Sequence, residues 1–178
     1  LASMADFEST GDFEVKASVK GMYNERENPE IKMDVNLEDG QITSSKMDGA
    51  LKDVSFKAVF DNGRLRSNRS SKFEIQDFKG YFNRELLELR LSVTDFDDPS
   101  IDFLMDGVAP VGMLYGFMGD PRIQKGSGEI EVKNLKLKGR YEDMIRTNRM
   151  DRVEAGGALE LDDASLTIED ETLTFDQG

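Results

Sequence analysis

The side chains that most often perform catalysis near neutral pH are missing from this sequence. It contains no cysteine and no histidine among its 178 residues. Thiolate nucleophiles, disulfides and zinc–sulfur sites are therefore excluded, as is the imidazole that enzymes use most often as a general base. Because only carboxylates, hydroxyls and amines remain for chemistry, we expect a non-enzymatic protein without a metal or other cofactor.

Carboxylates are so abundant that their chemistry has to be judged by spacing. Asp95, Asp97 and Asp98 form a cluster, but a calcium-binding loop also needs a glycine at its sixth position and a glutamate at its twelfth. The spacing here does not meet that pattern, so the cluster predicts a solvated turn. The acidic residues 162–163 and 169–171 are interpreted as charged turns at strand ends. With 36 acidic residues, no carboxylate pair specifically indicates glycoside hydrolysis.

Three short motifs carry weaker signals. Gly126-Ser127-Gly128 precedes a strand, whereas a phosphate-binding glycine loop follows a strand and opens a helix, so a nucleotide site is not expected. Asn68-Arg69-Ser70 matches the glycosylation sequon, a pattern that is informative only in a eukaryotic secreted chain. A local basic patch could meet a lipid head group or an acidic partner, although an exposed strand and loop is the favoured interpretation. Its members are Arg64, Arg66, Arg69 and Lys72.

The net charge of −13 argues against nucleic acid as a partner, because phosphate backbones would repel so acidic a chain. No apolar run reaches the roughly 18 residues that a membrane-spanning helix needs, and the longest candidate, Val108–Met118, contains Pro110 and two glycines. The chain starts at Leu1 and continues directly into polar sequence, without a signal peptide. We therefore expect a fragment of a longer protein.

Alternation of apolar and polar residues runs along the whole chain and predicts a mainly β protein. Two clear runs are Phe13–Val19 and Ile31–Leu37, with a loop between them. Asp39-Gly40 and Asn62-Gly63 are typical of tight hairpin turns. We expect roughly nine to eleven strands, mostly antiparallel, in a single β-rich domain over residues 1–178.

The alternation repeatedly slips by one residue. Ile130 and Val132 share one phase, whereas Leu135 and Leu137 fall on the opposite one. Further slips lie between Leu51 and Val54, Ile75 and Phe78, Val93 and Phe96, and Leu161 and Ala164. A β-bulge restores the facing after one extra residue and bends the strand, so repeated bulges would curl a sheet into a trough. Alternatively, each slip marks a turn, or a strand that passes between the two sheets of a sandwich.

Two segments interrupt the strands. Val108–Met118 places its apolar residues on one helical face and predicts a short helix that plugs the end of the core. Glu142–Glu154 has few apolar residues and predicts an irregular or marginally helical excursion.

The order of segments resembles the AsmA-like family of bacterial envelope proteins, which includes TamB-type and other repeating-β-groove proteins. DGALKDVSFKAVFDNGRL (48–65) leads into a long paired-strand segment (72–107) that contains the sequence DDPSIDF. The apolar segment VAPVGMLYGFMGD follows, and then GSGEIEVKNLKLKGRYEDM (126–144). The resemblance covers residues 48–144, a little over half of the chain.

The resemblance implies a long, curved, mostly antiparallel sheet, a β-groove whose apolar concave face carries phospholipid acyl chains. It further implies a role in lipid transport or outer-membrane biogenesis and homeostasis. The implied place is the periplasm of a Gram-negative bacterium, with the parent protein anchored in the inner membrane by an N-terminal helix. Such a helix is not in this sequence, which fits a fragment. The candidate groove residues are Phe13, Val15, Leu87, Leu89, Leu91, Ile130, Val132, Leu135 and Leu137.

Two alternatives stay open at the level of sequence. Each candidate groove residue fits a closed core equally well. The chain could also be a β-sandwich or jelly-roll module that binds a carbohydrate or a protein, although it has no tryptophan and only four scattered tyrosines, which counts against sugar binding. A carboxylate-based hydrolase is a third and weaker possibility.

Overall fold

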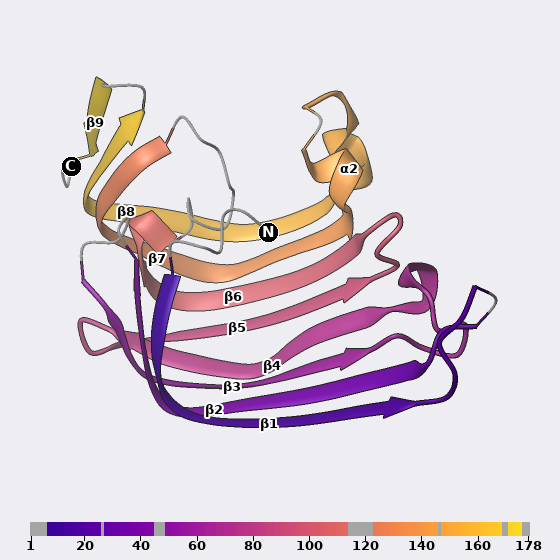
Figure 1. Cartoon of the computed structure of the whole chain (residues 1–178). Coiled ribbons are helices and arrows are strands. Elements are labelled where there is room, and N and C mark those ends of the chain that lie inside the picture. The colour runs from indigo at the N-terminus through magenta and orange to yellow at the C-terminus, as the bar shows by residue number, and fades with distance from the viewer. Residues whose placement is uncertain are drawn as a thin grey trace.

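Nine β-strands form one antiparallel sheet in the computed structural model of the chain, and their order in the sheet follows the sequence from β1 to β9 (Figure 1). The structure describes residues 7–25, 27–44, 49–113, 123–145, 147–168 and 171–175. The strands are β1 (Phe7–Lys20), β2 (Glu30–Ser44), β3 (Leu51–Asp61), β4 (Lys72–Phe82), β5 (Glu85–Thr94), β6 (Ser100–Pro110), β7 (Ile123–Arg140), β8 (Glu154–Ile168) and β9 (Glu171–Phe175). Short helical elements are η2 (Asn68–Ser70), α2 (Tyr141–Met144) and η3 (Thr147–Arg152).

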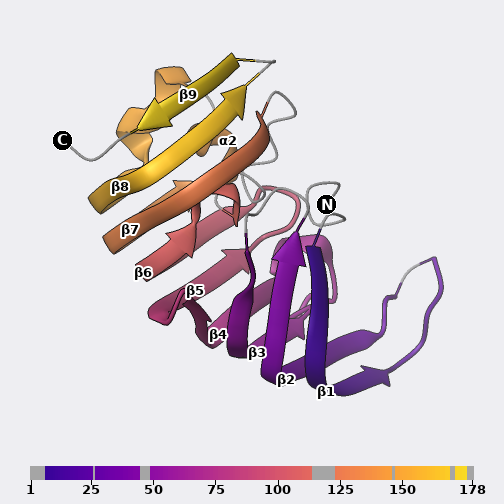
Figure 2. The same ribbon diagram turned by 90° about the vertical axis from the view of Figure 1, so that its left-hand side faces the viewer.

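The sheet is open and strongly curved, as the two perpendicular views show (Figures 1 and 2). Each strand pairs with the next one along the chain, and the strands bend so that the sheet encloses a concave side. The expected mainly β fold with a curved, antiparallel sheet is therefore confirmed. Within the described ranges the strands build a single layer, so the β-sandwich alternative is wrong.

Four of the five phase slips are β-bulges. The pairing register shifts beside Asp53 in β3, Asp77 in β4, Asn134 in β7 and Asp163 in β8. The slip between Val93 and Phe96 is instead a turn, because β5 ends at Thr94 and the connection to β6 starts at the next residue. At each of these four positions the strand contains one extra residue, and the apolar pattern changes phase there. Because a bulge bends its strand, these residues contribute to the curvature of the sheet.

The chemical identity of these bulge residues explains why the bulges form there. The four residues above have φ between 42° and 52°, in the left-handed region. That region is unfavourable for most L-amino acids, and asparagine and aspartate tolerate it best after glycine because their short polar side chains bond locally to the backbone. A fifth residue of this kind, Asp39 (φ 50°), lies at a bulge in β2.

This fifth bulge corrects the hairpin prediction for Asp39-Gly40. The dipeptide lies inside β2 and not at its end, because the left-handed backbone that suits a hairpin turn also suits a bulge. Asn62-Gly63 does follow β3, but it opens a longer connection that contains η2. The tight hairpin between β4 and β5 is instead made by Asn83-Arg84, both with positive φ, which the search for Asn-Gly and Asp-Gly pairs missed.

The two interrupting segments are only partly helical. The first remains in β6 up to Pro110 and is helical at 111–113, and its remainder lies outside the described residues. The second contains α2 and η3, as the expectation of a marginally helical excursion requires. Here the buried carboxylate of Asp143 accepts a bond of 3.4 Å from Arg149 Nη1, which ties the two short helices together.

The core lies on the concave side, close to the bulges. Leu37, Val54, Leu87 and Val132 are almost completely buried, and they belong to one contiguous cluster. Its other members are Leu51, Phe78, Phe82, Leu89, Met105, Ala109, Val111, Met113, Ile130 and Ala164. A single layer therefore buries part of one face by bending over itself.

Gly107 in β6 is the position where close packing at the bend depends most clearly on the absence of a side chain. Its φ is +111°, and a Cβ there would overlap the carbonyl oxygen of Leu86 in β5. Gly156 in β8 offers a contrast, since a Cβ there would meet nothing within 4 Å.

We expect Gly107→Ala to lower the free energy of unfolding by about 2–3 kcal/mol, because the substitution adds both backbone strain and a steric clash. Gly156→Ala, the matched control, should change the free energy by less than about 0.5 kcal/mol. Urea denaturation followed by circular dichroism measures both. Equal losses in the two variants would contradict the role assigned to the bend.

Candidate functional site

A continuous apolar row crosses the concave face from β1 to β8. Cross-strand pairing places its members directly opposite one another, and paired residues share a face of the sheet. The row consists of Val15, Val35, Ala58, Ile75, Leu91, Phe103, Leu137 and Ala155. A parallel row lies closer to the ends of the strands. It consists of Ala17, Met33, Phe60, Phe73, Val93, Ile101 and Gly139.

All nine candidate groove residues lie on this concave face, but they do not share one environment. Leu87, Leu89, Ile130 and Val132 belong to the buried cluster, so they form closed core. Leu91, Leu135 and Leu137 are half-buried. The remaining two, Phe13 and Val15, are 50% and 58% exposed because β1 forms an edge of the sheet.

Pairing brings further apolar side chains to the face that sequence reasoning did not select. They are half-buried and line the open part of the concave face on strands β2 to β6: Met33, Val35, Phe56, Phe60, Phe73, Ile75, Val93, Ile101 and Phe103. The rings of Phe56 and Phe78 stack with centroids 6.1 Å apart, which joins the open part to the buried cluster. The signal was the same alternation in the neighbouring strands, and only the pairing register shows that these residues continue the rows.

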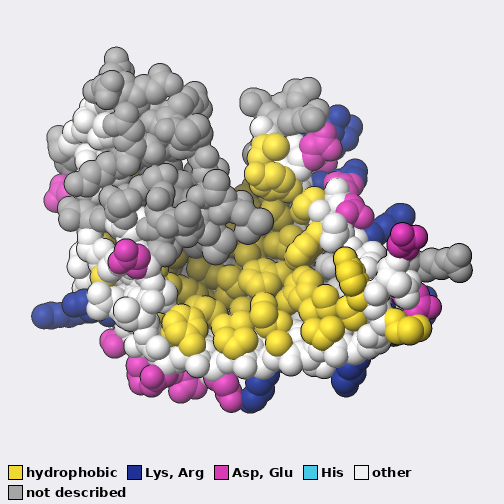
Figure 3. Space-filling view, viewed as in Figure 1, with side chains coloured by type: hydrophobic (Ala, Val, Ile, Leu, Met, Phe, Trp, Pro, Cys, Tyr) yellow, Lys and Arg dark blue, Asp and Glu magenta, His cyan; other side chains and the backbone are white. Residues whose placement is uncertain are grey.

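Apolar side chains cover the hollow of the curved sheet in the space-filling view (Figure 3). Acidic and basic side chains gather around the rim and on the outer side in the same view. The candidate functional site is therefore the half-exposed part of this concave face, which we call the apolar groove. It is defined by the two rows given above.

The convex face carries many charged side chains and cross-strand ion pairs, with single apolar residues such as Leu104 among them. Lys133 on β7 bonds Glu160 on β8 at 2.7 Å, and Lys138 on β7 lies 3.0 Å from Asp102 on β6. The hydrogen bond from Lys133 lowers the pKa of the Glu160 carboxyl below its ordinary value. These four side chains are between 42% and 61% exposed, so they keep this face solvated and contribute little to stability.

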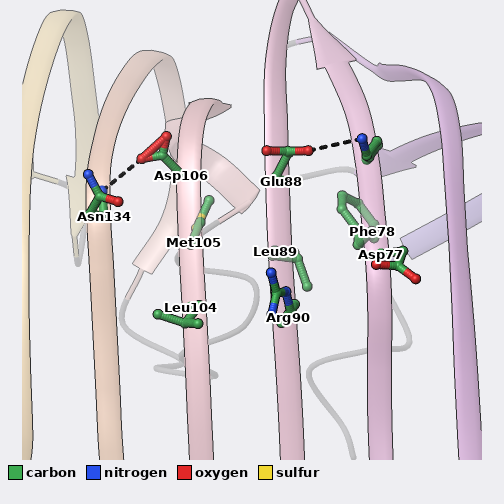
Figure 4. Close-up of a pocket in the computed structure, with 10 residues that line it drawn as sticks. Asp77, Phe78, Glu88, Leu89, Arg90, Leu104, Met105, Asp106 and Asn134 are labelled. Atoms are coloured by element: carbon green, nitrogen blue, oxygen red, sulfur yellow. Dashed lines mark hydrogen bonds and ion pairs between the residues drawn. The ribbon is translucent and has the colours of Figure 1, made fainter.

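A hollow of about 390 Å³ is lined by β4 to β7, where the bulges at Asp77 and Asn134 flank the paired strands β5 and β6 (Figure 4). Two of its carboxylates, those of Glu88 and Asp106, are engaged by neighbours. Glu88 pairs with Lys79 at 3.2 Å, and Asp106 Oδ2 accepts the backbone N–H of Asn134 at 2.8 Å. These two contacts therefore tie β4 to β5 and the Asn134 bulge of β7 to β6.

The prediction of a charged turn at 162–163 is wrong, because these residues lie inside β8, where Asp163 forms a bulge. Of the segment 169–171, residues 169–170 lie outside the described residues. The cluster of Asp95, Asp97 and Asp98 has local structural partners. Asp95 Oδ1 accepts the backbone N–H groups of Asp97 and Asp98, both at 3.3 Å, and Asp98 pairs with Arg140. The cluster thus closes the turn between β5 and β6, as predicted. Across the part of the chain that the structure describes, no group of three acidic side chains is arranged to hold a metal ion.

The loops at one end of the strands, on the right of Figure 1, are held together by the buried side chain of Asn62. Its Oδ1 accepts the N–H of Ile31 at 2.9 Å, and its Nδ2 donates to the carbonyl of Pro29 at 2.8 Å. The Ser70 hydroxyl donates to the Asn62 carbonyl at 2.6 Å. The β1–β2 loop and the β3–β4 connection are therefore locked to each other beside the groove.

Comparisons with known proteins leave the chain without an assigned family. No family model, no curated protein and no solved structure matches it. Among the described residues, no helix has the length and apolar character required to cross a membrane.

We expect Asn62→Ala to lower the free energy of unfolding by about 2 kcal/mol, because the backbone groups of Pro29 and Ile31 lose their buried partner. Asn36→Ala is the matched control, since Asn36 bonds only the exposed carboxylate of Glu38, at 3.1 Å. Thermal and urea unfolding measure the difference. A loss in Asn36→Ala as large as that in Asn62→Ala would contradict the locking role.

Proposed function

We propose that this chain is a non-enzymatic segment of a bacterial envelope protein whose apolar groove holds the acyl chains of lipids during transport or outer-membrane biogenesis. The observation that carries the proposal is the pair of apolar rows on the concave face, most of whose members stay half-exposed or exposed in a single-layer sheet. Soluble proteins rarely leave so continuous an apolar surface without a ligand or partner for it.

The dimensions of the groove suit an acyl chain. The longer row joins eight strands, from Val15 to Ala155. Neighbouring strands lie about 4.8 Å apart, so a row of this length measures roughly 34 Å along the curved sheet. An acyl chain in one leaflet reaches about 15 Å, half of the hydrocarbon thickness of a bilayer. The groove therefore has room for a complete chain along its floor.

The sequence resemblance to AsmA-like proteins supports the same proposal independently of the side-chain geometry. It also supplies the location, a segment of an inner-membrane-anchored protein that faces the periplasm. A surface module that binds carbohydrate is favoured less, because such modules use grouped aromatic side chains. Here the tyrosines Tyr23, Tyr81 and Tyr141 are exposed on different elements.

Leu91→Gln should weaken binding of a fluorescent acyl-chain probe about fivefold. The polar amide removes apolar contact on the groove floor that contributes roughly 1 kcal/mol to the binding free energy. Leu104→Gln is the matched control. Leu104 is the residue opposite Arg90 on the convex face and is 38% exposed, so its replacement should leave uptake unchanged. Probe titration monitored by fluorescence, with circular dichroism to confirm folding, measures both.

A second measurement examines the natural contents of the groove. Phospholipid that co-purifies with the chain should be detectable by mass spectrometry, and it should be depleted in Leu91→Gln. The proposal fails if the folded wild-type chain neither retains lipid nor takes up the probe. It also fails if the two glutamine variants lose uptake to the same extent.

A further inference from the structure

A cavity of about 500 Å³ lies at the loop end of the groove and combines an apolar wall with charged residues. Phe60 and Ile31 form part of its wall, and Phe60 also belongs to the second apolar row of the groove. Polar lining comes from the β1–β2 loop, the β3–β4 connection and the β5–β6 turn. It consists of Tyr23, Asn28, Asn62, Arg66, Ser67, Asn68, Ser71 and Asp97. The cavity and the groove therefore share Phe60. They differ in polarity, because the cavity is also lined by charged and polar side chains.

Arg66 supplies the positive charge of this cavity. Its guanidinium packs above Gly21, where a Cβ would lie 3.1 Å from Nη1, and the same nitrogen donates to the Asn28 carbonyl at 3.4 Å. The Arg66 carbonyl accepts the Asn28 amide at 3.0 Å, which fixes the base of the side chain. No described carboxylate forms an ion pair with Arg66. The guanidinium is therefore positioned by the backbone and keeps donors for an anion.

Asp97 supplies the negative charge from the opposite loop. Its backbone N–H donates to Asp95 Oδ1 at 3.3 Å, which fixes its place in the turn. The adjacent Phe96 ring lies 5.9 Å from the ring of Phe60, so the turn rests against the apolar wall. Within the described ranges, the Asp97 carboxylate pairs with no cation, including Arg66. Two opposite charges therefore line one cavity without neutralising each other.

We infer that this cavity is a headgroup site for zwitterionic phospholipids, with Arg66 binding the phosphate and Asp97 binding the ammonium group. This inference rests on the proposed function, because the acyl chains of the same lipid would lie in the groove beyond Phe60. Charge complementarity selects the occupant. A purely anionic headgroup would satisfy Arg66 and be repelled by Asp97, whereas an uncharged headgroup would engage neither.

The experiment compares binding of three lipids that carry the same fluorescent acyl chain: phosphatidylethanolamine, phosphatidylglycerol and diacylglycerol. The wild-type chain should bind phosphatidylethanolamine most tightly. Arg66→Gln should weaken both phospholipids about tenfold, the usual effect of losing a charge-assisted hydrogen bond. Asp97→Asn should weaken only phosphatidylethanolamine and should tighten phosphatidylglycerol, because the repulsion is removed. Diacylglycerol binding should be the same in every variant.

Matched controls carry the same charge changes away from the cavity. Arg69→Gln alters an exposed arginine of η2 that does not line it, and Asp34→Asn alters an exposed carboxylate on the convex face of β2. Both should bind all three lipids as the wild type does. Arg66→Lys should retain part of the phosphate affinity, which separates a lost charge from a disturbed loop.

The outcomes separate the two proposals. If the wild type binds none of the three lipids, the proposed function fails and this inference fails with it. If diacylglycerol and phosphatidylethanolamine bind equally well, the groove stands and the headgroup site is overturned. Soluble phosphoethanolamine should compete with labelled phosphatidylethanolamine only at concentrations far above that of the lipid, because it lacks the acyl chains. If it binds as tightly as phosphatidylethanolamine, the cavity is a site for a small soluble ligand and the inference is overturned.

Discussion

A single-layer sheet has to shelter an apolar face without a second layer to cover it, and the rest of this structure follows from that constraint. The sheet meets it by bending sharply at bulges, so that side chains on both sides of the bend close over each other. Each bend requires a residue that accepts the left-handed backbone region, and aspartate or asparagine fills that role at Asp39, Asp53, Asp77, Asn134 and Asp163. The bulges therefore create the core as well as the shape.

Bending buries only part of the apolar face. The part that stays half-exposed is the apolar groove, the candidate functional site. Close to the bulges, residues such as Leu87 and Val132 are sealed and provide stability. Further along the same strands, Leu91, Phe103 and Leu137 face the same hollow and remain half-exposed. The convex side has an opposite composition, with lysine–carboxylate pairs across β6, β7 and β8 that keep it in water. The two faces of the sheet thus differ in polarity. Along each strand of the concave face, the side chains differ in how far they are exposed to solvent.

Much of the fold could be predicted from the sequence because strands and bulges leave local signals. Alternation identified the β class, and the slips at Asp53, Asp77, Asn134 and Asp163 marked real bulges. Asp39-Gly40 was wrong as a hairpin because one dipeptide serves two backbone geometries, and only the pairing partners decide between them. The extent of burial was not predictable either. Leu89 and Leu91 belong to the same alternating run, yet one is closed core and the other lines the groove. They lie on opposite sides of the bulge at Asp77, with Leu89 opposite Phe78 and Leu91 opposite Ile75. Phe60 and Arg66 could not be placed together from sequence, because their meeting depends on the fold of the β3–β4 connection.

The strict chain order of the strands has a consequence for how the molecule holds together. Among the described residues, each strand forms its backbone ladder only with the strands that precede and follow it in the chain. The pairing energy of the sheet is therefore close to a sum over hairpins, as in a linear array of repeats. Fraying then starts at the outermost strands and moves inward while the middle of the sheet keeps its pairing. The same topology makes the trough extensible, because one more hairpin lengthens it without rearranging any existing pair.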